Sequence, residues 1–259
     1  MAARVKIALL AAAIALALAT LAQAETTQRG TLRVSFEGRL SPKALPRQGS
    51  APVAVTVGGR IATTDGSSPP QLQTIAIAIN REGRLDLAGL PSCTLKQIQP
   101  STTAGALAAC RGSLVGEGSF SAKVLLPQQS PFPSEGKVYA FNGTFHGKPA
   151  ILAHVYGTEP APTSSTIPFA ISRASGTYGI LLSASLPQVT ANWGYVTGLE
   201  MTLGRAYRYR GRPHSYLSAA CPAPKGFPGA TFPFARASFG FAHHETLTTT
   251  LTRSCKVRG

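Results

Sequence analysis

Apolar and polar residues alternate along much of the chain with the period of two that a half-buried β-strand requires. Leu32, Val34 and Phe36, for example, are separated by single polar residues. Comparable runs recur between turn-forming sequences, and the strands they predict span residues 53–57, 75–79, 138–145, 150–156, 167–171, 178–186, 195–210, 232–241 and 247–251. The pattern predicts an all-β protein of the antiparallel β-sandwich type, built as one large or two successive β domains with one short helix.

Proline-rich sequences separate these runs and indicate where the chain divides. Residues 127–136 (PQQSPFPSEG) carry three prolines and two glutamines without any apolar period, which is typical of a linker or long loop. We therefore expect an N-terminal β domain over residues 25–126 and a C-terminal β domain over residues 137–259.

One segment departs from the strand pattern. Between the first two cysteines, Ser101 or Thr102 is placed to cap a short helix that contains Ala106–Ala109. Cys110 follows directly, so a disulfide to Cys93 would fasten this helix to the neighbouring strand.

The N-terminus has the organisation of a secretory signal peptide. Arg4 and Lys6 precede an apolar run from Ile7 to Leu21, and the triplet Ala22-Gln23-Ala24 fits a signal-peptidase site. The run is 15 residues long, shorter than the roughly 20 that span a bilayer as a helix. We expect residues 1–24 to be removed, with an uncleaved anchor as the alternative. The mature chain would carry no transmembrane anchor and would be secreted or held in the cell envelope.

The four cysteines predict two disulfides, because an even number in an exported chain is typical of oxidised pairs. They are Cys93, Cys110, Cys221 and Cys255. Of the three possible pairings we expect Cys93–Cys110 and Cys221–Cys255, since each closes a local loop, with partners 17 and 34 positions apart. A metal site is the alternative, and it would require closely spaced cysteines or histidines that the sequence lacks.

Charge narrows the choice of partner. Residues 25–259 contain 23 lysines and arginines against 10 aspartates and glutamates, a net charge of +13. A chain with this balance is attracted to anionic surfaces. Outside the cytoplasm these are acidic polymers, glycans and lipid headgroups, so nucleic acid is not expected.

The densest basic sequence interleaves arginine with tyrosine. It comprises Arg205, Tyr207, Arg208, Tyr209, Arg210 and Arg212. In an extended strand the tyrosines would share one face and Arg208, Arg210 and Arg212 would line the other. Arginine binds phosphate and carboxylate bidentately and tyrosine suits sugar rings, so this run predicts binding of an anionic ligand. A solvated strand face, or a hairpin whose charges resist edge-to-edge aggregation, is the simpler interpretation.

Sequence motifs for catalysis are missing. No serine is centred in G-x-S-x-G, and no glycine loop for phosphate is present. We expect no cofactor and favour a protein without enzymatic activity. The alternative is an extracellular hydrolase or metalloprotein that uses His243 and Glu245, which would share one strand face, together with His154 or His146 from a neighbouring strand. A polar hairpin turn is the simpler interpretation of the string around His243.

Three long phrases resemble a family of exported actinobacterial proteins of unknown function. They are KALPRQGSAPVAVTVGGRIATTDGSSPPQLQTIAIAIN (43–80), the segment from LPSC (90–93) to CRGSLVGEGSF (110–120), and CPAPKGFPGATFPFA (221–235). The resemblance covers most of the mature chain and implies an exported β-rich fold, without implying an activity.

Together these features predict a secreted or cell-envelope β-rich protein that is non-catalytic. Its expected partner is an anionic envelope polymer or glycan, and a purely structural role is the other possibility. The sequence leaves the oligomeric state open.

Overall fold

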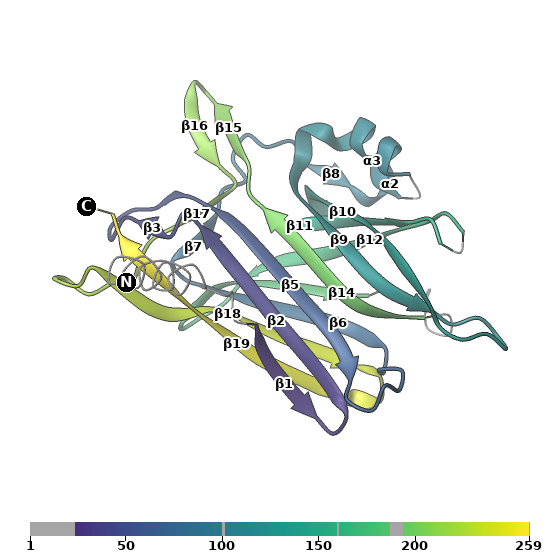
Figure 1. The fold of residues 1–259 in the computed structure, drawn as a ribbon. Helices are drawn as coiled ribbons and strands as arrows, with labels where there is room; N and C mark the ends of the chain where they lie inside the picture. The colour runs from purple at the N-terminus through teal and green to yellow at the C-terminus, as the bar shows by residue number, and fades with distance from the viewer. Residues whose placement is uncertain (1–23, 100–101, 160, 187–193, 259) are drawn as a thin grey trace, which may run out of the picture.

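The computed structural model describes residues 24–99, 102–159, 161–186 and 194–258. Residues 1–23 of the predicted signal peptide lie outside this range. Strands hold 64% of the structure and helices 8%, which confirms the all-β class. Figure 1 shows the arrangement.

Most of the strands predicted from the sequence are longer in the structure than the pattern indicated. Their bounds are β1 (Glu25–Arg29), β2 (Leu32–Ser41), β3 (Ala44–Leu45), β4 (Ala51–Pro52), β5 (Ala54–Thr63), β6 (Leu72–Asn80), β7 (Gly83–Leu85), β8 (Cys93–Thr94), β9 (Leu114–Val124), β10 (Phe132–Phe145), β11 (Lys148–Gly157), β12 (Thr163–Arg173), β13 (Tyr178–Ser185), β14 (Gly194–Leu203), β15 (Ala206–Tyr209), β16 (Arg212–Ser215), β17 (Leu217–Ala219), β18 (Gly229–Phe241) and β19 (Thr246–Val257). The helices are α2 (Leu95–Ile98) and α3 (Thr103–Cys110), with 3-10 turns η1 (Arg111–Ser113) and η3 (Ala242–His244).

One large sheet contains nearly all of these strands. Its order is β1-β2-β5-β14-β9-β10-β11-β12-β13-β6-β18-β19-β3, with β8 paired to β10. Neighbours are antiparallel except for the short parallel pairs β8–β10 and β3–β19. Two small sheets stand apart, the β15–β16 hairpin and the three-stranded β4-β17-β7.

Strands from the two halves of the chain alternate within the large sheet. β14 lies between β5 and β9, and β6 lies between β13 and β18. Of the two arrangements predicted from sequence, one large or two successive β domains, this strand order is that of one sheet. The segment predicted as a linker, residues 127–136, contains the turn of the β9–β10 hairpin and the first five residues of β10, which pair with β9. Proline at this position is accommodated at the start of a long strand.

The sheet curls so that its two ends face each other and enclose the main core. In Figure 1, β2 and β5 lie in front of β6, β18 and β19. Phe36 of β2 meets Phe239 of β18 edge to face, with ring centroids 6.0 Å apart. Gly38 of β2 lies so close to Leu251 and Phe234 that an added Cβ would come within 2.9 Å of the leucine side chain. The inward apolar positions of the alternating pattern therefore form this core.

A helical cover (residues 93–99 and 102–113) lies on the outer face of β10 and β11 and encloses a second, smaller core. Ile98, Ala106, Phe141 and Leu152 are among its members that have no exposed surface. The predicted helix is confirmed: α3 begins after Thr102, whose Oγ1 accepts a hydrogen bond from the backbone N–H of Gly105 at 3.2 Å.

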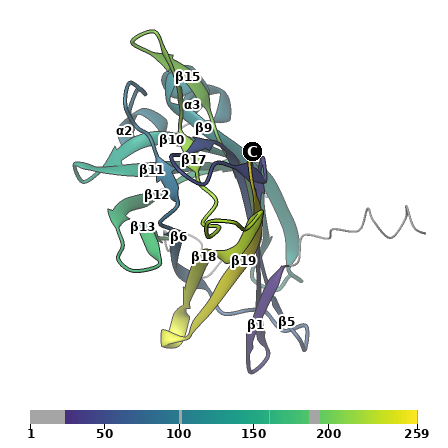
Figure 2. The same cartoon turned by 90° about the vertical axis from the view of Figure 1, so that its left-hand side faces the viewer.

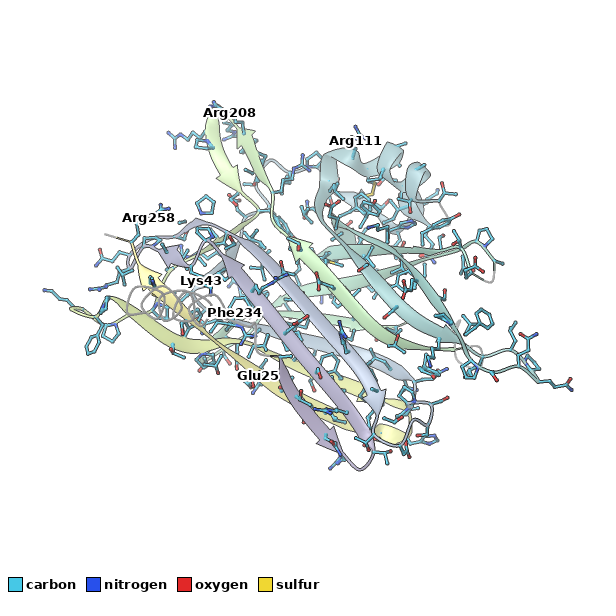
Figure 3. All side chains as sticks on the ribbon, in the orientation of Figure 1. Glu25, Lys43, Arg111, Arg208, Phe234 and Arg258 are labelled. Carbon is cyan, nitrogen blue, oxygen red and sulfur yellow. A yellow bond between two sulfur atoms is a disulfide. The ribbon has the colours of Figure 1, made fainter. Side chains whose placement is uncertain are left out.

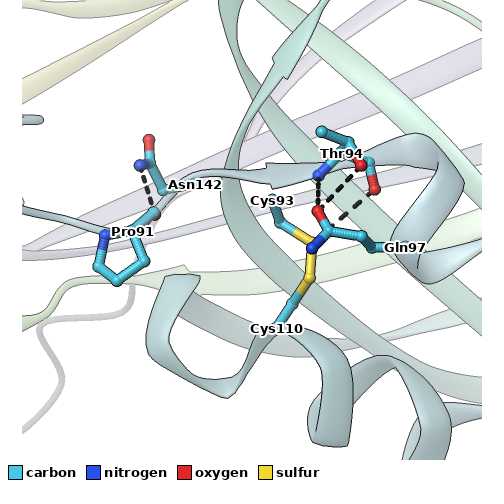
Figure 4. The surroundings of a disulfide bond; sticks show 6 residues. All are labelled: Pro91, Cys93, Thr94, Gln97, Cys110 and Asn142. Carbon is cyan, nitrogen blue, oxygen red and sulfur yellow. Dashed lines mark hydrogen bonds between the residues drawn. A yellow bond between two sulfur atoms is a disulfide. The ribbon is translucent and has the colours of Figure 1, made fainter.

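Both predicted disulfides are present. The Cα atoms of Cys93 and Cys110 are 5.9 Å apart, and this bond fastens α3 to the strand beside β10 (Figure 4). The Cα atoms of Cys221 and Cys255 are 5.7 Å apart, and this bond joins the loop before β18 to β19. Two disulfides indicate an oxidising, extracytoplasmic environment. Among the described residues, no helix has the length and apolar character needed to cross a membrane.

Candidate functional site: the β15–β16 hairpin and the groove at its foot

The arginine–tyrosine sequence forms a hairpin that projects from the body of the protein (Figure 1 and Figure 2). β15 and β16 are joined by a two-residue turn at Arg210 and Gly211, whose φ angles are 50° and 75°. Two successive positive φ angles are the requirement of a type I′ hairpin turn, and glycine meets it without strain. Residues 195–210, predicted as one strand, are divided into β14 and β15 at Gly204 and Arg205.

The turn changes the predicted distribution of side chains. Tyr207 pairs with His214 and Tyr209 pairs with Arg212, so these four residues share one face of the hairpin. Arg208 pairs with Pro213 on the opposite face. The prediction that Arg208, Arg210 and Arg212 line one face is therefore wrong, because the chain reverses at Arg210.

The tyrosine face fastens the hairpin to the loop that follows β7. His214 Nδ1 lies 2.7 Å from Asp86 Oδ2, and the His214 ring stacks on Tyr207 with centroids 5.4 Å apart. The Tyr207 hydroxyl donates to the carbonyl oxygen of Ala88 at 2.8 Å. Gly89 lies directly against the Tyr209 ring, where a Cβ would come within 2.2 Å of a ring carbon. The tyrosines are thus used in attaching the hairpin.

The electrostatics of this attachment are consistent with an ionised Asp86. Its pKa is lowered, first by the hydrogen bond from His214, although partial burial acts in the opposite direction. The pKa of the Tyr207 hydroxyl is raised by burial and by the negative charge of Asp86. Tyr207 therefore remains a hydrogen-bond donor at neutral pH.

The arginines at the tip remain available to a partner. Arg208, Arg210 and Arg212 are exposed. Arg210 lies over the ring of Tyr209 at 5.2 Å, and Arg208 reaches only the carbonyl oxygen of Gly211 at 3.4 Å. Among the described residues, which include all ten carboxylate side chains, none forms an ion pair with these three guanidinium groups. Figure 3 shows Arg208 at the outer end of the hairpin.

Arg205 has a different position from the other predicted site residues. Its Nη1 donates to the carbonyl oxygens of Gly112 and Leu114, at 2.6 and 2.8 Å. The side chain thus ties the foot of the hairpin to the end of the helical cover. It contributes charge at the base of the site rather than at the tip.

A groove of about 800 Å³ opens on the outer face of the sheet at the foot of the hairpin. It carries three basic side chains and one acidic side chain, together with a half-buried tyrosine; these are Arg111, Lys137, Arg205, Glu117 and Tyr139. A groove of this size is comparable to the sites that hold small ligands. Sequence reasoning missed Arg111, Lys137 and Tyr139, because only strand pairing brings them together.

A second groove of about 740 Å³ continues along the same outer face and shares Ser119 and Lys137 with the first. Its charge is reversed, since Glu37, Glu135 and Glu200 outnumber Arg60 and Lys137. The positive end of this surface is therefore the end next to the hairpin.

The residues of the alternative metal site are not assembled. His154 lies in β11, where it is fully buried between its strand neighbours Tyr139 and Thr166. Neither of its ring nitrogens has a hydrogen-bond partner, and burial lowers its pKa. His243 belongs to the turn between β18 and β19, and Glu245 follows it. Within the described ranges, no group of three or more histidine, cysteine, aspartate or glutamate side chains is placed to hold a metal ion. The string around His243 forms the hairpin turn.

Comparison with protein-family models, with curated proteins and with solved structures finds no match to this chain. The resemblance to exported actinobacterial proteins stays a prediction.

Proposed function

We propose that this protein is a secreted or cell-envelope module that binds anionic surface polymers or acidic glycans without catalysing a reaction. The observation that carries the proposal is the presence of three exposed guanidinium groups on one projecting tip, none of them ion-paired. Guanidinium groups form bidentate hydrogen bonds with phosphate and carboxylate, and a projecting tip can reach a polymer without displacing the body of the protein.

Two further observations support this function. The groove at the foot of the hairpin adds Arg111, Lys137 and Arg205 to the positive surface, with Glu117 as its one carboxylate. The tip and the groove could therefore contact successive acidic units of one chain. Residues 25–259 have a net charge of +13, which favours long-range attraction to such a polymer. The disulfides and the predicted signal peptide support export.

Binding of residues 25–259 to a defined acidic polysaccharide such as polygalacturonate, and to a polyglycerol phosphate, tests the proposal. The triple variant Arg208→Ala, Arg210→Ala, Arg212→Ala should weaken binding by at least about tenfold, because charged hydrogen bonds contribute about 1.5–3 kcal/mol each. The matched control is Arg29→Ala, Arg33→Ala, Arg39→Ala, three exposed arginines at a distance from the hairpin in sequence and in sheet position.

The control removes the same net charge, so it should weaken binding only about twofold through general electrostatics. Wild-type affinity should fall steeply between 50 and about 300 mM salt, as the Debye length shortens. Equal losses in the two triple variants, or binding that does not depend on salt, would show that the hairpin is not the binding site.

A further inference from the structure

A second basic surface lies at the end of the protein where three segments meet. These segments are residues 43–47, 221–229 and 255–258, and we call them the basic end. The backbone N–H of Cys221 donates to Pro46 O at 2.9 Å, and that of Arg258 donates to Leu45 O at 2.7 Å. The N–H of Val257 donates to Pro228 O at 2.8 Å, and the Cys221–Cys255 disulfide joins two of the segments covalently. The three segments therefore form one continuous surface.

The basic end displays a large apolar side chain to solvent. Phe227 is 60% exposed, and it is the one large hydrophobic residue among those described that is classed as exposed. Its loop is well fixed: the N–H of Phe227 donates to Pro224 O at 3.1 Å, and Arg47 Nη2 donates to Phe227 O at 2.7 Å. With the disulfide next to it, this loop holds the ring outward in a defined position.

The three segments that carry the exposed ring also carry basic side chains and no acidic residue. The lysines and arginines of the three segments are Lys43, Arg47, Lys225, Lys256 and Arg258. All but Arg47 are exposed, and none forms an ion pair within the described part of the chain. Figure 3 shows Lys43 and Arg258 at the same end of the molecule. None of the ten acidic residues of the protein belongs to these segments.

We propose that the basic end docks on an anionic lipid bilayer, with the Phe227 ring inserted at the level of the headgroups. Aromatic rings are favoured at that depth, and each lysine or arginine near an anionic surface adds attraction. A hydrated anionic polymer could pair with the basic side chains, but it has no apolar interior in which the Phe227 ring could be buried. The combination of one exposed aromatic ring with basic side chains on the same joined segments therefore favours a bilayer.

This surface is independent of the hairpin. The hairpin carries tyrosines that are already packed against the body, whereas Phe227 is unpacked. The protein would thus have one surface for a polymer and another for the membrane beneath it.

Sedimentation of residues 25–259 with lipid vesicles tests the docking. Vesicles of phosphatidylcholine with 30% phosphatidylglycerol should retain the protein, and vesicles of phosphatidylcholine alone should retain at least about tenfold less. Phe227→Ala should weaken binding to the anionic vesicles about fivefold, in line with loss of partial insertion of one aromatic ring. Lys225→Ala with Arg258→Ala should weaken it about thirtyfold, since each charge near the surface contributes roughly 1 kcal/mol.

The hairpin triple variant Arg208→Ala, Arg210→Ala, Arg212→Ala is the control, and it should retain vesicle binding within about threefold despite losing three charges. Circular dichroism and disulfide content should be unchanged in all variants, because the substituted side chains are exposed. Unchanged binding in Phe227→Ala and in the lysine–arginine variant would overturn the proposal. Loss of polygalacturonate binding in these variants, without any binding to vesicles, would assign the surface to a polymer and overturn it as well.

Discussion

Two structures leave the large sheet on its outer side, and they are attached in opposite ways. The helical cover is held by a disulfide and by side chains with no exposed surface, such as Ile98 and Leu152. The β15–β16 hairpin is held by half-exposed polar contacts, among them His214 with Asp86 and Tyr207 with Ala88. Arg205 connects the two, since it lies at the foot of the hairpin and donates to the end of the cover.

This difference indicates that the helical cover stabilises the fold, whereas the hairpin presents side chains to solvent. Burial of apolar surface stabilises about 25 cal/mol per Å², whereas a partly exposed ion pair contributes at most about 1 kcal/mol. The cover should therefore unfold only with the sheet, and the hairpin should detach locally. Local opening at low free energy is typical of elements that bind partners.

Removal of the Cys93–Cys110 disulfide should have the largest effect. Cys93→Ser with Cys110→Ser should lower the free energy of unfolding by about 3 kcal/mol, on the loop-entropy model for a 17-residue separation. Urea denaturation measures this loss. Amide exchange should show that α3 becomes unprotected while the hairpin is unchanged.

Cys221→Ser with Cys255→Ser is the matched control for this experiment. It should cost a similar or slightly larger free energy, because the partners are 34 residues apart. It should leave the amides of the cover protected. Protection of α3 after loss of its own disulfide would mean that the apolar contacts alone hold the cover.

Acid should weaken the sheet face beside the cover before it loosens the hairpin. Burial holds the pKa of His154 below its ordinary value of 6.5, so the unfolded chain binds a proton that the folded protein excludes. The free energy of unfolding is therefore unaffected by this histidine above pH 6.5. Below pH 6.5 it falls by up to about 1.4 kcal/mol per pH unit. Thermal unfolding from pH 7.5 to 5 measures the slope. His154→Leu should reduce it, and His244→Asn, at an exposed turn, should not.

Loss of the helix cap should destabilise the protein through the cover. Thr102→Ala removes the side-chain oxygen that accepts from Gly105 and should lower stability by about 1 kcal/mol. Thr102→Ser keeps the acceptor and should cost less. Equal effects of the two substitutions in urea denaturation would show that the hydroxyl does not stabilise α3.

Asp86→Asn should have the smallest global effect and act on the hairpin. Asp86 is 37% exposed, so the free energy of unfolding should change by less than about 1 kcal/mol. Faster amide exchange in residues 206–215 is the expected local result. The pKa of Asp86 in the folded protein lies below its ordinary value of 3.8. The stabilisation by the ionised carboxylate is therefore fully present above pH 3.8, and it is lost as the pH falls through the folded pKa. Unchanged exchange would show that the aromatic contacts suffice.

The sequence predicted the local features well. The alternation at Leu32–Phe36 predicted β2, and Thr102 was one of the two caps expected for α3. Both disulfide pairs were expected because each closes a local loop, and both are confirmed. A hairpin was one interpretation of the arginine–tyrosine sequence, but the single strand predicted over residues 195–210 placed no turn before Arg210, although Gly211 is a recognised signal for a tight turn.

The non-local features were beyond the sequence pattern. Lys137, Tyr139 and Arg111 line one groove only because β9 pairs with β10 and the cover ends beside them. The burial of His154 likewise depends on its neighbours, since Tyr139 and Thr166 come from other strands. Alternation gives the face of a residue within its own strand, but pairing order is set by contacts between distant segments.

The interleaved strand order also has a kinetic consequence. β6 completes its pairing only with β18, and β5 only with β14, more than 130 residues later in each case. A ribosome releases the earlier partners long before the later ones, so the growing polypeptide cannot close its sheet and stays loosely structured. Such high contact order slows folding, so the sheet is expected to close only after the last third of the chain has been made.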